Sequence, residues 1–249
     1  MMSHSGNMKK QLLDMYKILN EFFGYRDWWP ADSPFEVCVG AILTQNTSWK
    51  NVVKAMERLK SHDSLDCSTL YYMGVEELAE LIRPAGYYNI KARRLKNFIN
   101  LLHEDFQADL DILFSAGESA APPIRPTQTK NPRIQPSRHC RDDFADVMEL
   151  RRILLSVNGI GKETADSMIL YAANMPVFVV DLYTRRVMIR HGLLNENADY
   201  DETQELFHRH LEPDTALFND FHAQFVAVGS RFCGTKPKCE ECPLKSFNR

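Results

Sequence analysis

The amino-acid sequence predicts an all-α protein. Apolar residues recur at the three- and four-residue spacing of helix faces along most of the chain, and few runs alternate as β-strands do. The chain has 249 residues, of which 44% are hydrophobic and 25% are charged, so it has room for two modest cores. A Gly-Ile-Gly segment also joins two helical stretches at residues 159–161, as a tight turn between helices would.

The first predicted helix lies near the N-terminus. Leu12, Tyr16, Leu19 and Phe23 are spaced so that they share one helix face. The polar segment 1–10 before them lacks the apolar stretch of a signal peptide, and no apolar run in the sequence is long enough to span a membrane.

A helix start signal follows at Ser33-Pro34-Phe35-Glu36. It combines a serine cap, a proline at the first helical position and a glutamate that is placed as a capping-box partner. We interpret the apolar segment 35–43 as a core helix.

Further amphipathic helices are expected after it. The first of them has the apolar residues Trp49, Val52, Val53, Met56 and Leu59. The second covers residues 75–82. The third has Ala92, Leu95, Ile99 and Leu102. The second must end before Pro84, because the residue that precedes a proline avoids helical backbone angles. Another helix is predicted at about residues 143–156.

Residues 115–141 interrupt this pattern. The segment contains five prolines with many Ser, Thr, Asn and Gln residues, and almost no large apolar side chain. Such a composition buries too little surface to order itself, so we expect a flexible surface insertion.

The charge of the chain gives a mixed indication. A formal net charge of −3 argues weakly against a nucleic-acid partner, but the basic residues are clustered. The clusters are Lys91, Arg93, Arg94 and Lys96; Arg185, Arg186 and Arg190; and Arg231, Lys236, Lys238 and Lys245. Each could be an ordinary solvated face, but their closeness to the motifs described next favours a surface that contacts phosphates.

The most informative motif is Asn158-Gly159-Ile160-Gly161-Lys162-Glu163-Thr164. Its glycines allow a tight turn, and the free N–H groups at the start of the following helix form an anion site that the helix dipole favours. Asp181 follows a second apolar stretch about twenty residues later and begins the predicted helical segment 182–190, so it could also be a plain helix N-cap. An ordinary helix–turn–helix connection explains the motif equally well, but a phosphate site beside a placed carboxylate suggests chemistry on a nucleic acid.

Two further segments have a similar double interpretation. Trp28-Trp29-Pro30 lies in a predicted turn, and with Trp49 it offers aromatic faces for a flat or cationic ligand; the alternative is one tryptophan in the core and one at the surface. Thr44-Gln45-Asn46-Thr47 ends an apolar helix. It is either a simple helix terminus or a polar wedge that fills the space left by an extruded nucleotide.

Together these segments resemble the endonuclease III branch of the helix-hairpin-helix DNA glycosylase superfamily, over about residues 26–248 without the insertion. The similarity rests on Leu43-Thr44-Gln45-Asn46-Thr47, Gly86-Tyr87-Tyr88-Asn89-Ile90-Lys91-Ala92, Gly159-Ile160-Gly161-Lys162-Glu163-Thr164-Ala165, Val180-Asp181 and Cys233…Cys239-x-x-Cys242-Pro243. Within that branch the chain is most similar to the bacterial 3-methyladenine DNA glycosylases of endonuclease III type.

The resemblance implies two helical domains with a lesion pocket between them. One is a six-helix barrel with the helix-hairpin-helix, at residues 33–176, and the other joins residues 1–32 to residues 177–249 and ends in a cysteine-rich loop. It also implies roles for single residues. These are Asp181 as the catalytic carboxylate and Gln45 as the intercalating wedge. From the chemistry of the residues themselves we expect Trp28, Trp29 and Trp49 to form the base pocket, and the DNA contacts to be Asn46, Gly159, Ile160, Gly161, Lys162 and Thr164.

One departure from the family pattern concerns the subclass. In bifunctional members a lysine follows Gly-x-Gly-x and attacks the sugar, whereas this chain has Glu163 there and Lys162 about a hundred degrees round the helix. Because a carboxylate cannot form a Schiff base, the resemblance implies a monofunctional glycosylase. Glu163 could add negative potential at the site.

The expected reaction is hydrolysis of the N-glycosidic bond of a flipped base in damaged double-stranded DNA. Asp181 would stabilise positive charge on the sugar and orient water, and the base would be an alkylated purine such as 3-methyladenine. The alternatives are an endonuclease III-like glycosylase and AP lyase for oxidised or mismatched pyrimidines, and a non-catalytic DNA-binding module. We expect a monomer in the cytoplasm, associated with the nucleoid.

Three of the six cysteines lie near the C-terminus, as Cys233, Cys239 and Cys242. They resemble the [4Fe–4S] loop of the family, but its fourth cysteine corresponds to Asn248. A non-cysteine ligand, a three-iron cluster, Cys140 from the insertion or a relic of the site would each explain this departure. Zinc is less favoured, because no histidine lies nearby in the sequence. We expect an iron–sulfur cluster that presents Lys236 and Lys238 to phosphates.

Overall fold

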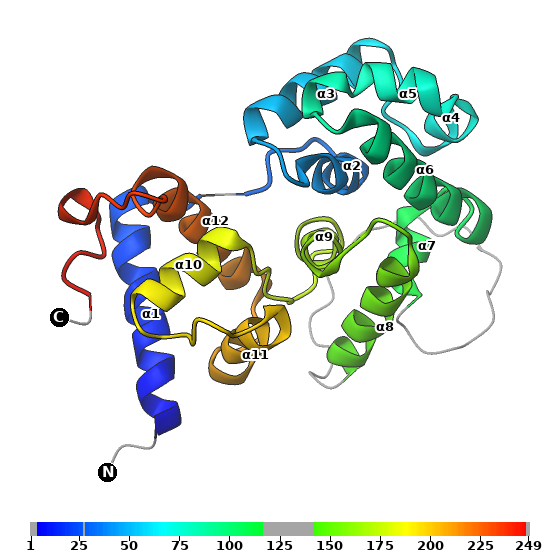
Figure 1. Ribbon diagram of the computed structural model, residues 1–249. Coiled ribbons are helices and arrows are strands. Elements are labelled where there is room, and N and C mark those ends of the chain that lie inside the picture. The colour runs from blue at the N-terminus through cyan, green and yellow to red at the C-terminus, as the bar shows by residue number, and fades with distance from the viewer. Residues whose placement is uncertain (1–3, 27, 117–141, 248–249) are drawn as a thin grey trace. The chain divides into compact units, whose positions relative to one another are not determined.

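The computed structural model describes residues 4–26, 28–116 and 142–247, and every regular element in these ranges is a helix (Figure 1). The all-α prediction is therefore confirmed for the described residues. Most of the predicted insertion, residues 117–141, lies outside them. None of the described helices is long and apolar enough to cross a membrane.

The chain divides into two compact units. The first contains residues 1–41 and 161–249, and the second contains residues 42–160. The division falls within α2 (Pro34–Thr44) and just before α9 (Lys162–Ser167), whereas the resemblance implies domain boundaries near residues 33 and 177. Compactness and family domain structure are different properties, so the predicted domain limits stay a prediction.

The 42–160 unit is built around one long helix, α6. Its elements are α3 (Trp49–Ser61), α4 (Cys67–Tyr72), α5 (Val75–Leu81), η1 (Arg83–Ala85), α6 (Tyr88–Asp105), α7 (Leu110–Ser115) and α8 (Asp142–Ser156). Both α4 and α5 pack against α6. The predicted apolar face of α6, which includes Leu95 and Leu102, has no solvent exposure.

A buried lysine joins three elements of this unit. Lys91 is 2% exposed, and its Nζ donates to the carbonyl oxygens of Leu43 and Ala85, each at 2.8 Å. Burial lowers the pKa of Lys91 to about 8, and Arg94 adds to the effect. Because carbonyl groups at helix ends lack partners within their helix, this ammonium group stabilises the ends of α2 and η1.

The first unit is built around α12 (Thr215–Arg231), which contacts α1 (His4–Phe23), α10 (Leu182–Arg190) and the π-helix η2 (Met168–Ala172). Figure 1 shows α1 and α12 side by side. The unit also contains α9, α11 (Tyr200–His210) and the short η3 (Cys239–Glu241). The predicted face of the first helix is confirmed, since Leu12 and Leu19 have no exposed surface.

The core of the first unit is largely aromatic. Phe178 stacks on Phe207 with ring centroids 3.7 Å apart, and Phe221 stacks on Phe225 at 4.8 Å. All four side chains are completely buried. Burial of rings of this size dominates the stability of such a core.

A buried carboxylate connects α12 to the N-terminal helix. Asp220 Oδ2 accepts hydrogen bonds from Tyr16 Oη at 2.8 Å and Asn20 Nδ2 at 2.9 Å, and Oδ1 accepts from the backbone N–H of Arg26 at 2.7 Å. Gln224 Nε2 donates to the Gly24 carbonyl oxygen at 2.8 Å. The segment that leads from α1 toward the tryptophan pair is thus hydrogen-bonded to α12.

The start of α2 agrees with its predicted cap, with one difference. Ser33 Oγ accepts from the backbone N–H of Glu36 at 3.2 Å, as expected of an N-cap. The Glu36 carboxylate accepts from the N–H of Asp32 at 2.8 Å. The glutamate therefore serves the residue before the cap as well as matching the sequence pattern of a capping box.

Candidate active site

Asp181 lies where the sequence predicted it, at the N-cap of α10. Its Oδ1 accepts a hydrogen bond from the backbone N–H of Thr184 at 2.7 Å. The preceding residues, Val179 and Val180, are buried, and the Asp181 side chain itself is 12% exposed. One carboxylate oxygen is therefore fixed by the N-terminus of the helix that Asp181 caps.

Glu163 lies in the first turn of α9. Its pKa is raised to about 7, first by desolvation and second by the charge of Asp181. The Glu163 side chain is open to solvent, so water screens part of this effect. The raised pKa means that Glu163 takes up a proton more readily than an isolated glutamate does.

Two residues that the sequence did not single out lie behind Asp181. His222 Nε2 of α12 is 3.8 Å from Asp181 Oδ2, and His222 Nδ1 is 2.5 Å from the hydroxyl of Tyr171 in η2. Burial lowers the pKa of His222, although Asp181 opposes the shift. Burial also raises the pKa of Tyr171 well above its ordinary value, with added effects of Asp181 and Asp220.

The tryptophan pair lies near the same residues. The rings of Trp29 and Tyr171 are 5.3 Å apart, and those of Trp28 and Trp29 are 5.6 Å apart. Both tryptophans are half-buried, so they expose part of their surface. A methyl group on Gly40 of α2 would lie only 3.3 Å from Cζ2 of Trp29, which shows how closely the indole packs against that helix.

Trp49, the third residue of the predicted base pocket, is half-buried at the first position of α3. It belongs to the 42–160 unit, whereas Trp28 and Trp29 belong to the first unit. Its part in an aromatic pocket stays a prediction.

In the 42–160 unit, the predicted wedge residue contacts the hairpin turn. Gln45 Nε2 donates to the carbonyl oxygen of Gly159 at 3.0 Å, and Arg94 Nη1 donates to Gln45 Oε1 at 2.6 Å. Gly159 has a φ of +99°, and a Cβ there would lie 2.2 Å from Cγ of Arg94. Glycine is thus required at this turn for both its backbone angle and its close packing.

The other predicted DNA contacts differ in their accessibility. Asn46 is exposed with a φ of +52°, whereas Ile160 is only 5% exposed, so its contact with DNA would have to come from its backbone. Lys162 forms an ion pair with Asp201, and Thr164 is buried. Gly161 is the N-cap of α9.

Part of the predicted basic surface has a structural role instead. Lys91 is buried, as described above, and Lys96 Nζ donates to the carbonyl oxygens of Leu70, Tyr71 and Met73. The prediction of a phosphate-contacting surface was therefore wrong for the buried Lys91, while Lys96 stabilises the end of α4. Sequence spacing did not distinguish a basic surface from ammonium groups that cap carbonyls.

The cysteine loop is held by arginines of α10. Arg190 Nη1 is 3.2 Å from Cys233 Sγ and 2.8 Å from the Gly234 carbonyl oxygen, and Arg186 Nη1 donates to the Cys233 carbonyl oxygen at 3.0 Å. Cys233 and Cys242 are buried and Cys239 is exposed. Burial raises the pKa of Cys242, as do the charges of the other two cysteines.

These residues do not fit a four-cysteine cluster. Among the described residues, no three Cys, His, Asp or Glu side chains are arranged to hold a metal ion, and Cys140 and Asn248 lie outside this range. The thiol of Cys233 also faces a guanidinium donor at hydrogen-bond distance. The predicted iron–sulfur cluster therefore finds no support from the geometry of the loop.

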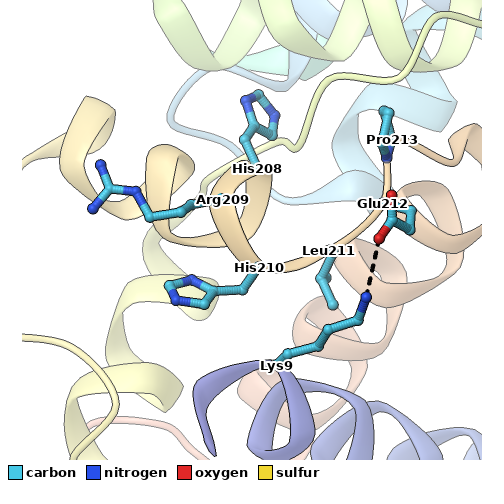
Figure 2. A pocket seen from close by; sticks show the side chains of 7 residues that line it. All are labelled: Lys9, His208, Arg209, His210, Leu211, Glu212 and Pro213. Carbon is cyan, nitrogen blue, oxygen red and sulfur yellow. Dashed lines mark hydrogen bonds and ion pairs between the residues drawn. The ribbon is translucent and has the colours of Figure 1, made fainter. Parts of the chain in front are cut away.

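A small hollow also lies in the first unit, lined by none of the site residues described above. It has a volume of about 290 Å³ and is lined by Lys9, His208, Arg209, His210, Leu211, Glu212 and Pro213, as Figure 2 shows. The cation of Lys9 is paired with Glu212 at 3.0 Å, and His208 Nε2 accepts from the N–H of Phe178 at 2.9 Å. These lining groups already have protein partners.

The chain matches the model of one protein family over residues 39–213, described as the HhH-GPD superfamily of base excision DNA repair proteins. A candidate DNA repair glycosylase of Methanocaldococcus jannaschii is 40% identical over 97% of this chain and 97% of its own length. Endonuclease III of Sulfolobus acidocaldarius is 24% identical over 99% and 96% of the two chains.

Solved structures give the same relationship. The H. pylori 3-methyladenine DNA glycosylase bound to 1,N6-ethenoadenine is 27% identical, with a TM-score of 0.65 over 91% of this chain and 97% of that one. A non-covalent endonuclease III–DNA complex has a TM-score of 0.72 at 20% identity and covers 97% of this chain and 95% of that one. The second similarity concerns the fold alone.

Proposed function

Because the chain belongs to the HhH-GPD superfamily of base excision DNA repair proteins, we propose that it is a monofunctional DNA N-glycosylase for alkylated purines such as 3-methyladenine. The observation that carries this proposal is the placement of two carboxylates at helix starts, Glu163 in the first turn of α9 and Asp181 at the N-cap of α10, where the charge of Asp181 helps to raise the pKa of Glu163. Glu163 occupies the position at which bifunctional relatives carry a nucleophilic lysine. A site with two carboxylates favours stabilisation of a cationic sugar over attack by an amine.

In this proposal Asp181 is the catalytic residue. Cleavage of the N-glycosidic bond leaves positive charge on the deoxyribose, and an anion close to that charge lowers the barrier. The hydrogen bond from the Thr184 N–H to Asp181 Oδ1 fixes the carboxylate in one orientation, while Oδ2 lies 3.8 Å from His222 Nε2, beyond hydrogen-bond distance. That second oxygen is suited to face the sugar or to orient the attacking water.

The tryptophan pair supports a cationic, aromatic base as the leaving group. Trp28 and Trp29 are half-buried rings close to Tyr171, in the same unit as Asp181. An alkylated purine is positively charged and electron-poor, so stacking on indole would be worth about 0.5–2 kcal/mol per contact. Such a base leaves readily without protonation. The H. pylori relative is a 3-methyladenine DNA glycosylase whose structure contains bound 1,N6-ethenoadenine.

We further propose that DNA is held by the hairpin backbone at residues 158–161 and by the Gln45 wedge. The hydrogen bond between Gln45 and Gly159 joins wedge and turn within one unit, so that they would engage the duplex together. The predicted lesion pocket between two domains, 33–176 and 1–32 with 177–249, is part of this proposal. So is the monomeric state.

A second candidate is an endonuclease III-like glycosylase with AP lyase activity, directed at oxidised or mismatched pyrimidines. It is favoured by the endonuclease III relatives found in sequence and fold. It would need an amine nucleophile other than residue 163. Lys162 is paired with Asp201, which makes it a poor choice.

The iron–sulfur cluster has no role in this proposal. Among the described residues no group of Cys, His, Asp or Glu side chains is arranged as a metal site, so the cluster stays a prediction; the arginines of α10 hold the loop by hydrogen bonds to its backbone and to Cys233. No step of the reaction is assigned to a cluster.

The test is incubation with duplexes that each carry one defined lesion, scored for released base before and after alkali treatment. We expect release of an alkylated purine, strand breaks only after alkali, and no covalent adduct with borohydride. Asp181→Asn is the matched variant, because asparagine also caps a helix and only the charge is lost. It should slow release by at least about 10²-fold. A borohydride adduct would favour the second candidate, and undiminished release by the variant would refute the role of Asp181.

A further inference from the structure

His222 is the one buried histidine in the described part of the chain that directs a ring nitrogen at the proposed catalytic carboxylate. Its side chain is 7% exposed, and Nε2 has no hydrogen-bond partner among the described residues. That nitrogen lies 3.8 Å from Asp181 Oδ2, within ion-pair range but longer than a hydrogen bond. Buried polar atoms are nearly always hydrogen-bonded, so this exception calls for an explanation.

The other ring nitrogen of His222 has a hydrogen-bond partner. His222 Nδ1 lies 2.5 Å from Tyr171 Oη, and the two rings have centroids 6.0 Å apart. Desolvation and the charge of Asp181 keep the tyrosine hydroxyl protonated, since they raise its pKa. The hydroxyl is therefore the donor and Nδ1 the acceptor when His222 is neutral.

This arrangement determines which nitrogen carries the proton. A neutral imidazole has one N–H, and with Nδ1 occupied as an acceptor the proton must reside on Nε2. The Nε2–H bond then faces Asp181 Oδ2. A histidine with a purely structural role would instead have both nitrogens satisfied by core groups.

We propose that His222 is a positioning residue for Asp181, which donates Nε2–H to Oδ2 in the reactive complex while Tyr171 maintains the required tautomer. Thr184 and His222 would then hold the two carboxylate oxygens from different sides. The proposal rests on the assignment of Asp181 as the catalytic carboxylate. Hydrogen bonds at catalytic groups are often long before the substrate is bound, and a closure of less than 1 Å would complete this one.

Two conservative substitutions separate positioning from packing. The amide nitrogen of glutamine lies about where Nε2 lies, and that of asparagine about where Nδ1 lies. His222→Gln therefore keeps a donor toward Asp181, whereas His222→Asn keeps only a short amide on the Tyr171 side, whose oxygen can accept from the tyrosine hydroxyl. Both are neutral amides, so each variant serves as the control for the other.

The first readout is the single-turnover rate of base release, measured with the half-saturating protein concentration and the melting temperature. We expect His222→Asn to lower the rate by about 10- to 100-fold, the effect of losing one hydrogen bond to a charged group, without a change in half-saturation. His222→Gln should stay within about threefold of wild type. Equal rates for both variants, whether fast or slow, would overturn the proposal, because position of the donor would then not matter.

The second readout requires no activity. Long-range ¹H–¹⁵N correlation spectra of the wild-type protein at neutral pH should show His222 as the neutral Nε2–H tautomer, and Asp181→Asn should shift its Nε2 resonance. A proton on Nδ1 would overturn the proposal even if the variants proved too unstable to assay. If no lesion is excised by wild type while the tautomer is as expected, then the proposed function fails and the His222–Asp181 interaction stands.

Discussion

Replacement of Glu163 by glutamine should change the pH dependence of stability in a direction that the structure fixes. Glutamine resembles the protonated carboxyl in shape but does not titrate. Desolvation and the charge of Asp181 raise the pKa of Glu163 from its ordinary 4.5 to about 7 in the folded protein. The folded state thus binds this proton more tightly than the unfolded state does.

The sign and size of the effect follow from this difference. Between pH 4.5 and 7 the unfolded protein releases the Glu163 proton first, so the wild type loses stability as the pH rises, and the loss is complete above pH 7. The full pKa difference corresponds to about 3.4 kcal/mol. Because the side chain is open to solvent, screening reduces this, and we expect about 1–2 kcal/mol.

The assay is urea unfolding of wild type and Glu163→Gln at pH 4.5 and at pH 8. The free energy of unfolding of the variant, minus that of wild type, should be about 1–2 kcal/mol larger at pH 8 than at pH 4.5. In an Asp181→Asn background the gain should shrink without vanishing, because desolvation remains. The same difference at both pH values would refute the reasoning, since it would mean that folding leaves the affinity of Glu163 for its proton unchanged.

Three further predictions concern the supporting structure. Gly229→Ala should lower the unfolding free energy by about 1–3 kcal/mol in urea titrations, because the new Cβ would lie 2.5 Å from Cβ of Tyr183. Gly234→Ala is the control. It should leave the unfolding free energy nearly unchanged, because nothing lies within 4 Å of the new Cβ. Arg94→Ala should weaken binding to lesion-containing duplex by about 10-fold in anisotropy titrations, because it frees Gln45 from its 2.6 Å contact; unchanged affinity would exclude a role for this contact. Tyr171→Phe should populate the Nδ1–H tautomer of His222 and slow base release by about 10-fold, and a spectrum like that of wild type would contradict the tautomer argument.

The sequence predicted the helices and the helix cap at Asp181 well, because both depend on local signals. The apolar spacing of α6 and the cap at Asp181 require only neighbouring residues to be read, and the structure confirms both. The iron–sulfur prediction lacked such a local test. It depended on whether three cysteines converge in space, and the described residues form no metal site.

Residues that act across the fold were missed for a related reason. His222 and Tyr171 are 51 positions apart, and each looks like an ordinary core residue of an apolar helix. Arg94 belonged to a basic cluster whose members proved to have different roles. The available signal was a histidine between two polar residues, Asp220 and Gln224, in a stretch that also contains several apolar and aromatic residues.

That alternation in α12 explains how one helix serves the site from two sides. Asp220 and Gln224 are one turn apart and bind α1 and the chain at residues 24–26, which leads to the tryptophan pair. His222 lies about 200° round the helix from Asp220, and it faces Tyr171 and Asp181. The segment that leads to the tryptophan pair and the proposed catalytic carboxylate are thus both contacted by α12. This helix is anchored in the core, since its Phe221 and Phe225 are fully buried. A loss of packing in α12 should therefore disturb base binding and cleavage together, whereas a change confined to the His222 ring should affect cleavage alone.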